Sequence, residues 1–170
     1  MPGLPSYATE FGSLEGYRKG KVDIIDDDPR RYAFSNIFEV ASTSRPYEKV
    51  ALGKNRQYVL EAIRAEGTSE WRTAPHDEFA LVMDGEVEIR LRKLGADDIG
   101  PTAERGSNAL AADPSGPEMG RVVARRGHMT LLPVGAAYQF AAAHPSVILL
   151  QTQEGPDTVY KWSEVIQTEP

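Results

Sequence analysis

The chain has 170 residues, a formal net charge of −6 at neutral pH and no cysteine. One domain of this length can bury a sizeable core, and the acidic balance disfavours nucleic acid and anionic membrane surfaces as partners. The missing cysteines exclude disulfides, iron–sulfur ligation and thiolate catalysis, while the absence of a long apolar run or a secretory signal predicts a cytoplasmic protein without a membrane span.

Residues 1–40 are predicted to form an N-terminal arm. The segment is rich in glycine, proline and charge, yet it also contains apolar and aromatic side chains at Tyr7, Phe11, Leu14, Tyr17, Tyr32 and Phe34. Because a solvated tail rarely carries so many such groups, we expect the arm to pack on the rest of the chain or on another subunit.

A β-barrel is predicted over residues 55–153. Its first strand falls at residues 56–66, where Tyr, Val and Ile favour a sheet. Farther along, apolar residues alternate with others on both sides of the dipeptide Asp84-Gly85, over residues 79–83 and 87–91. A period of two across a tight Asp-Gly turn predicts a β-hairpin.

The second half of the chain contains an insertion, further strands and a tail. Residues 95–120 are rich in Gly, Pro and Ala, and loops of this length are uncommon in compact domains unless they are functional or disordered. Strands are predicted at 121–124, 129–132, 138–142 and 147–153. The tail, residues 157–168, has apolar residues at helical spacing after Asp157, which predicts a short C-terminal helix with Asp157 as its N-cap.

Two spacings indicate the fold class. Six residues separate Glu78 from Gly85, and a second motif runs through Gly127, Pro133, Gly135 and Tyr138. These spacings resemble the paired motifs of the cupin superfamily. The resemblance implies an all-β fold, a cupin-type double-stranded β-helix (jelly-roll) barrel, in one degenerate domain that spans residues 1–170.

The chain departs from the metal-binding cupins at their histidines. Those proteins bind a metal through two histidines before the glutamate and a third in the second motif. The corresponding positions here are Trp71 and Thr73, or Arg72 and Ala74, and then Tyr138. Only Glu78 remains, whereas Fe(II), Zn(II) and Mn(II) prefer imidazole and carboxylate together. We therefore expect no metal in this chain, and Trp71 and Tyr138 to fill the space of the missing ligands.

Two functions stay open for a cupin that acts without another subunit. One is a homomeric cupin enzyme, either metal-dependent through His76, Glu78 and His128 or metal-free with His76 as a base. The other is a cupin that binds a small molecule without catalysis.

A narrower resemblance covers most of the chain, including RRYAFSNIFEVAS, GKNRQYVLEAIRAEG and WRTAPHDEFALVMDGEV and the tail around Trp162. These segments resemble the small (alpha) subunit of the two-component hydroquinone 1,2-dioxygenases of aromatic degradation. The resemblance implies an α2β2 heterotetramer in which a larger cupin subunit holds Fe(II) and uses O₂ to cleave hydroquinone to 4-hydroxymuconic semialdehyde. It also implies that this chain has no catalytic residue of its own, and that Trp71, Arg72 and His76 are candidates to line the substrate pocket.

Overall fold

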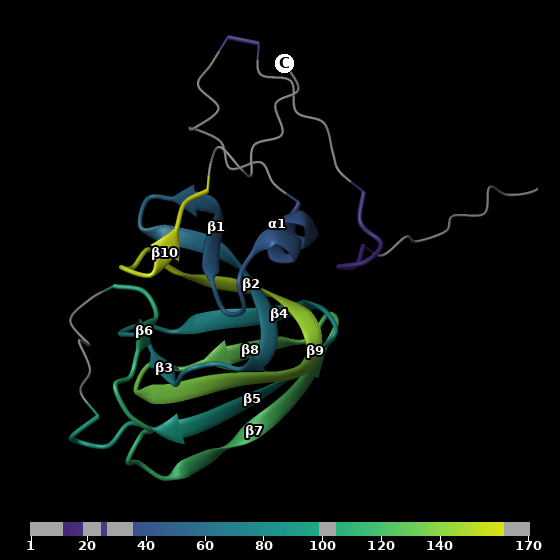
Figure 1. Cartoon of the computed structure of the whole chain (residues 1–170). Coiled ribbons are helices and arrows are strands. Elements are labelled where there is room, and N and C mark those ends of the chain that lie inside the picture. The colour runs from purple at the N-terminus through teal and green to yellow at the C-terminus, as the bar shows by residue number, and fades with distance from the viewer. Residues whose placement is uncertain (1–11, 19–24, 27–35, 99–104, 162–170) are drawn as a thin grey trace, which may run out of the picture.

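The computed structural model describes residues 12–18, 25–26, 36–98 and 105–161. The described part contains one helix and ten strands (Figure 1). Their bounds are α1 Ile37–Thr43, β1 Lys49–Asn55, β2 Tyr58–Thr68, β3 Arg72–Thr73, β4 Glu78–Asp84, β5 Glu86–Lys93, β6 Asn108–Ala109, β7 Glu118–Arg125, β8 Met129–Leu132, β9 Ala136–Gln153 and β10 Thr158–Val159. Among the described residues, no helix is long and apolar enough to cross a membrane.

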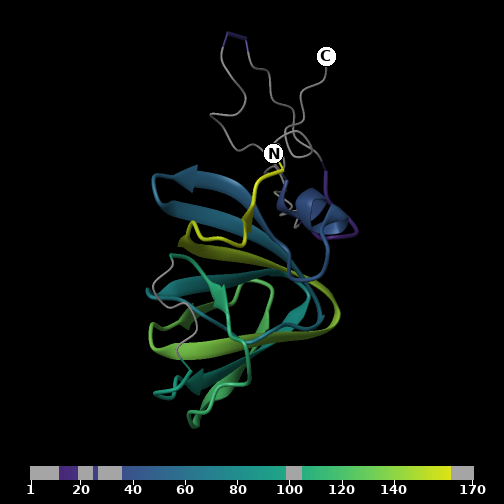
Figure 2. The same ribbon diagram turned by 60° about the vertical axis from the view of Figure 1, so that its left-hand side comes forward.

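The long strand β9 holds the sheet together. Its first half pairs with β5 and touches β3, and its second half pairs with β4, while β2 runs along both halves. As a result the sheet curls around one core, as a half-barrel (Figures 1 and 2). The prediction of a mostly β, cupin-like fold is confirmed. The two strands predicted at 138–142 and 147–153 are one continuous strand, because the chain bends between them without losing its partner β2.

The predicted hairpin at Asp84-Gly85 is wrong. The strands β4 and β5 do form at the predicted places, but β4 pairs with β8 and β9, and β5 pairs with β7 and β9. Gly85 is a single connecting residue with φ of 76° that lies against Ser146 at the bend of β9. The left-handed glycine conformation therefore marks a corner between the two halves of the sheet, not a two-residue turn.

The core and the helix occupy opposite faces of the curled sheet. Inward side chains such as Val82, Ile89, Phe140 and Ile148 form the main core. The helix α1 begins at the N-cap Asn36, whose side chain accepts a hydrogen bond from the backbone N–H of Phe38 at 2.9 Å, as N-cap residues do. The helix packs on the outer face of β1 and β2, so the end of the predicted arm contacts the barrel.

The predicted C-terminal helix does not begin at Asp157. Thr158 and Val159 instead form β10, which pairs in parallel with β1, Tyr160 and Lys161 are not helical, and residues 162–168 of the predicted helix lie outside the described residues. In the predicted 95–120 insertion, β6 pairs with β3, and the backbone N–H groups of Gly95 and Ser115 donate to the Asp98 carboxylate at 2.6 and 2.8 Å. The pairing of β6 thus attaches the insertion to the barrel, and Asp98 connects its two described parts.

Candidate functional site

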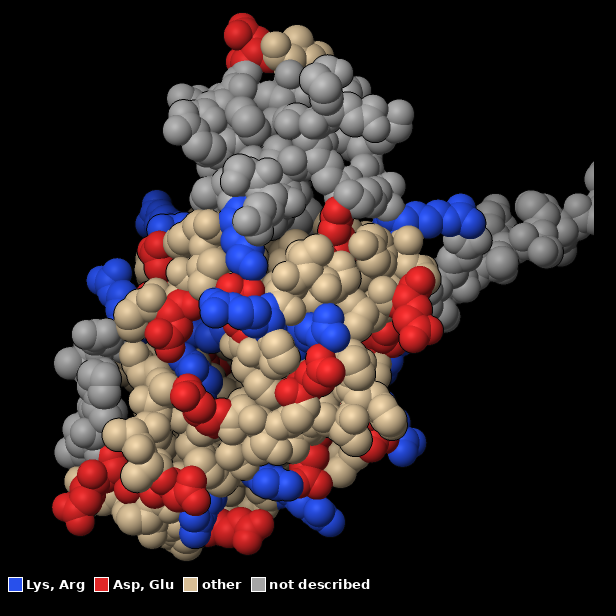
Figure 3. All heavy atoms as spheres, viewed as in Figure 1, with Lys and Arg blue, Asp and Glu red and all other residues tan. Residues whose placement is uncertain are grey.

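A cavity of about 670 Å³ opens at one end of the barrel. Its apolar part is formed by inward side chains of β2 and β9, namely Ile63, Tyr138, Phe140 and Leu150. Lys49, Arg72 and Ser107 supply polar groups on its wall. On the face seen in Figure 3, cationic and anionic side chains are interleaved. The cavity therefore combines an apolar floor with a wall of paired charges.

Lys49 and Glu61 form a buried ion pair beside this cavity. Strand alternation turns both side chains inward from the neighbouring strands β1 and β2, where their exposed fractions are 3% and 0%. The Lys49 Nζ lies 3.4 Å from Glu61 Oε2, and Thr158 donates to Glu61 Oε1 at 2.7 Å. Burial lowers the pKa of Lys49 and raises the pKa of Glu61, and each shift is opposed by the charge of the partner.

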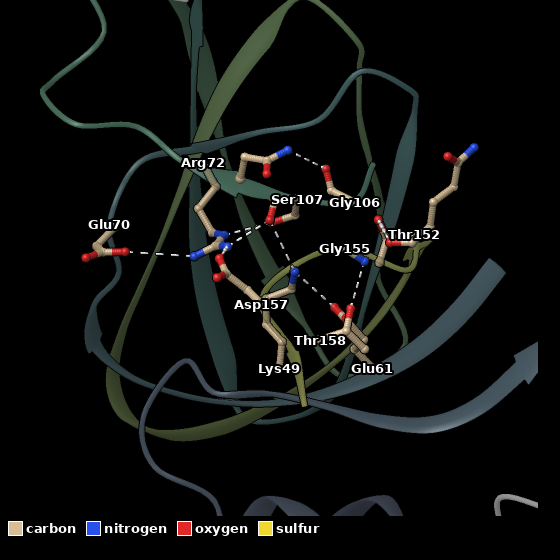
Figure 4. Close-up of polar contacts among 12 residues, drawn as sticks. Lys49, Glu61, Glu70, Arg72, Gly106, Ser107, Thr152, Gly155, Asp157 and Thr158 are labelled. Atoms are coloured by element: carbon tan, nitrogen blue, oxygen red, sulfur yellow. Dashed lines mark hydrogen bonds and ion pairs between the residues drawn. The ribbon is translucent and has the colours of Figure 1, made fainter. Parts of the chain in front are cut away.

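Arg72 joins three segments at the mouth of the cavity (Figure 4). Its Nε donates to Ser107 Oγ at 2.7 Å, and its Nη2 donates to the Ser107 carbonyl at 2.8 Å. The same Nη2 pairs with the Asp157 carboxylate, and Nη1 lies 3.8 Å from Glu70. Since Asp157 precedes β10 directly, the guanidinium connects β3, the segment before β6 and the start of β10.

Glu78 and Tyr138 meet deeper in the barrel with polar atoms that have no hydrogen-bond partner within the described part of the chain. These atoms are both carboxylate oxygens of Glu78 and the hydroxyl of Tyr138. Burial raises the pKa of Glu78, although neighbouring Thr152, Tyr138 and Lys49 act in the opposite direction. Burial also raises the pKa of Tyr138, with the Glu78 charge adding to the effect.

Replacing Glu78 by glutamine should stabilise the chain at alkaline pH. Because the folded pKa is raised, protonated Glu78 fits the folded state, and stability is lost as pH rises from the unfolded value of 4.5 towards the folded pKa. A glutamine cannot ionise, so we expect the variant to be more stable than the unmodified chain at pH 8, because it has no buried charge to form there. The gain should shrink towards pH 5 in urea unfolding curves. A gain that is the same at both pH values would contradict this assignment.

His76 is held outside the cavity. Its Nε2 accepts a hydrogen bond from the backbone N–H of Gln153 at 3.1 Å and lies 3.0 Å from the Thr152 hydroxyl. Burial lowers the pKa of His76, with Asp77 opposing the shift. His128 lies in the turn between β7 and β8, where its Nδ1 accepts from the backbone N–H of Arg125 at 2.9 Å. The site proposed for His76, Glu78 and His128 is therefore not assembled.

The residues at the cupin ligand positions do not fit a metal ion. Arg72 is cationic, Ala74 has no donor atom, and the Thr73 hydroxyl donates to the Ala136 carbonyl at 2.9 Å. Trp71 stands before β3 and is half-buried, and it does not line the cavity. Within the described ranges, no group of three or more His, Cys, Asp or Glu residues could hold a metal.

Sequence reasoning missed four residues of this site: Lys49, Glu61, Ser107 and Asp157. Glu61 carried a usable signal, because it interrupts an apolar strand at a position whose neighbours two residues away are buried. Ser107 and Asp157 carried none, since both lie in connecting segments that only the fold brings together. Arg72 was singled out, and it proves to be a structural centre of the cavity wall.

Comparison with known proteins yields no matching family model and no matching curated protein. Two solved structures match nearly the whole chain. A chain of hydroquinone 1,2-dioxygenase from Sphingomonas sp. TTNP3, solved with 4-hydroxybenzoate bound, is 56% identical with a TM-score of 0.89 and covers 97% of this chain and 100% of its own length. A chain of hydroquinone 1,2-dioxygenase PnpCD, solved with Cd²⁺ and 4-hydroxybenzonitrile, is 52% identical with a TM-score of 0.86 and covers 96% and 98%.

A longer chain shares only the fold. It was solved as hydroquinone 1,2-dioxygenase PnpCD in complex with Fe³⁺, and it is 10% identical to the present chain with a TM-score of 0.59. The alignment covers 84% of the present chain and 40% of that chain. Structures of PnpCD thus contain two kinds of chain related to this one, a near-complete match of its own size and a longer chain of similar fold.

Proposed function

Because the chain belongs to the family of hydroquinone 1,2-dioxygenase chains whose size it matches, we propose that it is the small, metal-free subunit of an Fe(II)-dependent dioxygenase. In this proposal the enzyme cleaves hydroquinone with O₂ to 4-hydroxymuconic semialdehyde. A larger cupin subunit holds the iron, and two copies of each subunit form a cytoplasmic α2β2 heterotetramer. The observation that carries the proposal is the 56% identity over 97% of this chain and 100% of the relative.

The residues of the barrel also support a small subunit without iron and a larger subunit that holds it. The ligand positions hold an arginine or tryptophan, an alanine or threonine, and a tyrosine, with Glu78 as the remaining carboxylate. Tyr138 and Arg72 occupy space where a metal-binding cupin would place imidazoles, and Arg72 is already paired with Asp157. An iron-dependent reaction would therefore need another chain to hold the iron, and PnpCD, whose structures contain a longer chain of similar fold, was solved in complex with Fe³⁺.

The test is co-expression of this chain with its larger cupin partner. We expect the two chains to co-purify, iron to load in proportion to the larger chain, and hydroquinone-dependent O₂ uptake to require both. The chain expressed alone and incubated anaerobically with Fe(II) should retain no stoichiometric iron. A well-behaved homomer of this chain that holds one iron per copy and consumes O₂ with hydroquinone would overturn the proposal.

Of the three pocket candidates, Trp71 is the best placed to serve a partner's substrate pocket. Arg72 and His76 are engaged within this chain. Arg72 lines the cavity of this barrel, and neighbouring residues of an extended segment point to opposite sides, so Trp71 is directed away from that cavity. An indole can pack against an aromatic ring while its N–H binds a polar group.

Replacing Trp71 by alanine should raise the KM for hydroquinone about tenfold, which is about 1.4 kcal/mol and within the range for loss of an aromatic contact. Iron content and subunit stoichiometry should stay unchanged, as measured by metal analysis and native mass. Trp71→Phe, which keeps a ring, should recover most of the loss. Unchanged kinetics in the alanine variant would remove Trp71 from the pocket.

A further inference from the structure

One outer face of the curled sheet is apolar, and the described residues leave Leu60, Phe79, Met129 and Leu131 on it exposed. The strands β2, β9, β4 and β8 lie side by side (Figures 1 and 2). Their register aligns outward residues in rows across the sheet. One row runs from Leu60 through Gln151 and Phe79 to Leu131, and the next runs from Ala62 through Leu149 and Leu81 to Met129. We define the apolar face as Leu60, Phe79, Leu81, Met129, Leu131 and Leu149.

Exposure distinguishes this face from the rest of the same sheet. Phe79, Leu131 and Met129 are 40%, 46% and 63% exposed. Beside them, α1 covers the neighbouring outer positions, because Val40 packs on Val50 and Ala62, and Phe38 packs on Val147 with Met83 against it. The helix thus buries Ala62 at the end of one row and leaves Phe79, Leu131 and Met129 exposed.

The neutrality of the face is unusual on an acidic chain. With 26% charged residues overall, none of the eight positions in the two rows is charged, and Gln151 is the one polar side chain among them. Scattered single apolar residues on a surface need no explanation, but a contiguous patch indicates an interaction site. The rows therefore indicate a contact with another surface.

An extended segment of this chain is too narrow to cover the face. Four adjacent strands span about 14 Å from the first to the fourth at about 4.8 Å per step, whereas one extended segment has the width of a single strand. Gly12, Phe38, Leu81 and Met83 border one apolar hollow at the edge of this face. The rows on β4 and β8 extend beyond that hollow and need a broader partner.

The size of the face fits the centre of a larger contact. A stable interface buries about 800 Å² on each partner and has an apolar centre with a polar rim. Six apolar side chains on four strands supply such a centre, with Gln151 between Leu60 and Phe79 and the Arg126–Asp84 pair nearby as a polar group. Two copies of this chain would bring together two charges of −6, so self-association is disfavoured at low ionic strength.

We propose that the apolar face binds the larger cupin subunit through a sheet or loop surface of that subunit. The inference rests on the proposed function, and it specifies which surface of this chain makes the contact. The longer chain found in PnpCD has a similar fold, and two sheets can pack face to face about 10 Å apart with apolar side chains between them.

Charge insertion into the face tests the proposal in the co-expressed complex. Phe79→Glu and Met129→Lys each place a charge at a position that is at least 40% exposed, so neither should prevent folding. The matched control is Val123→Glu on β7, where the native side chain is 48% exposed on the other half of the sheet. Circular dichroism and thermal unfolding check that all three variants fold.

We expect Phe79→Glu and Met129→Lys to weaken binding of the larger subunit at least 100-fold, as measured by sedimentation of the mixed chains, and Val123→Glu to leave it within twofold. Full co-purification of both face variants would overturn the inference while leaving the proposed function intact. A second outcome would also overturn the inference: this chain alone forms a dimer, and the face variants lose that dimer but still bind the larger subunit. Failure of the unmodified chains to associate would instead refute the proposed function.

Discussion

Replacing Lys49 by methionine should lower the free energy of unfolding by about 3–5 kcal/mol, because the change leaves the Glu61 carboxylate buried without its ion-pair partner. Glu61 is fully buried, and its Oε2 has no other hydrogen-bond partner in the described chain. Urea unfolding measures the loss. Since burial raises the pKa of Glu61, the unpaired carboxyl can take up a proton, and the loss should become smaller as pH falls.

The double variant Lys49→Met with Glu61→Leu is the decisive comparison. Removing both charges should restore most of the lost stability, since apolar residues of similar volume often replace a buried pair at little cost. Lys54→Met is the control, because the Lys54–Glu154 pair is 37% exposed on each side and surface pairs contribute about 1 kcal/mol or less. Equal losses at Lys49 and Lys54 would show that burial does not set the strength of the inner pair.

Replacing Gly85 by alanine should destabilise the chain by at least about 3 kcal/mol. Two effects add: a left-handed φ costs a non-glycine residue about 1 kcal/mol or more, and the new Cβ would lie 2.2 Å from Ser146 Oγ and 3.1 Å from Ser146 Cα. The second effect forces the corner between β4 and β5 away from β9, as overpacking does. Thermal and urea unfolding both report the loss.

Gly67→Ala separates the two effects. Gly67 has the same φ of 76°, but a Cβ at this position meets nothing within 4 Å. Its alanine variant should therefore lose only about 1 kcal/mol, and the difference between the two variants measures the contact with Ser146. Ser146→Gly should relieve part of the loss in Gly85→Ala and none in Gly67→Ala. Equal losses of unfolding free energy in Gly85→Ala and Gly67→Ala would show that the left-handed backbone conformation accounts for the whole cost.

Local patterns were sufficient for most strands. Alternation over residues 79–83 and 87–91 located β4 and β5, and the second motif located β8 within its observed bounds. The pairing of these strands could not be predicted from local patterns. Asp84-Gly85 suits both a hairpin and a corner, and only the pairing partners of β4 and β5 distinguish the two. Helical spacing after Asp157 was outweighed by the pairing of β10 with β1.

The candidate site was predictable at the positions that a family motif marks, Arg72, Glu78 and Tyr138, of which Arg72 and Tyr138 line the cavity. The buried charges of the site could not be predicted from the sequence. Lys49 reads as a surface lysine beside Glu48 in the sequence, and only the pairing of β1 with β2 turns it inward towards Glu61. Such contacts depend on residues that are distant in sequence, so no local pattern predicts them.

The course of β9 has a consequence for the order in which the protein can fold. Residues 136–153 are made after β2, β3, β4 and β5, yet all four of these strands hydrogen-bond to them. Until that segment arrives, the early strands have no common partner, and pairings as distant as Tyr58 with Gln153 predict slow folding. The nascent chain therefore carries unpaired strand edges until β9 has been made, and such edges promote aggregation. An early encounter with its partner or a chaperone would shield them.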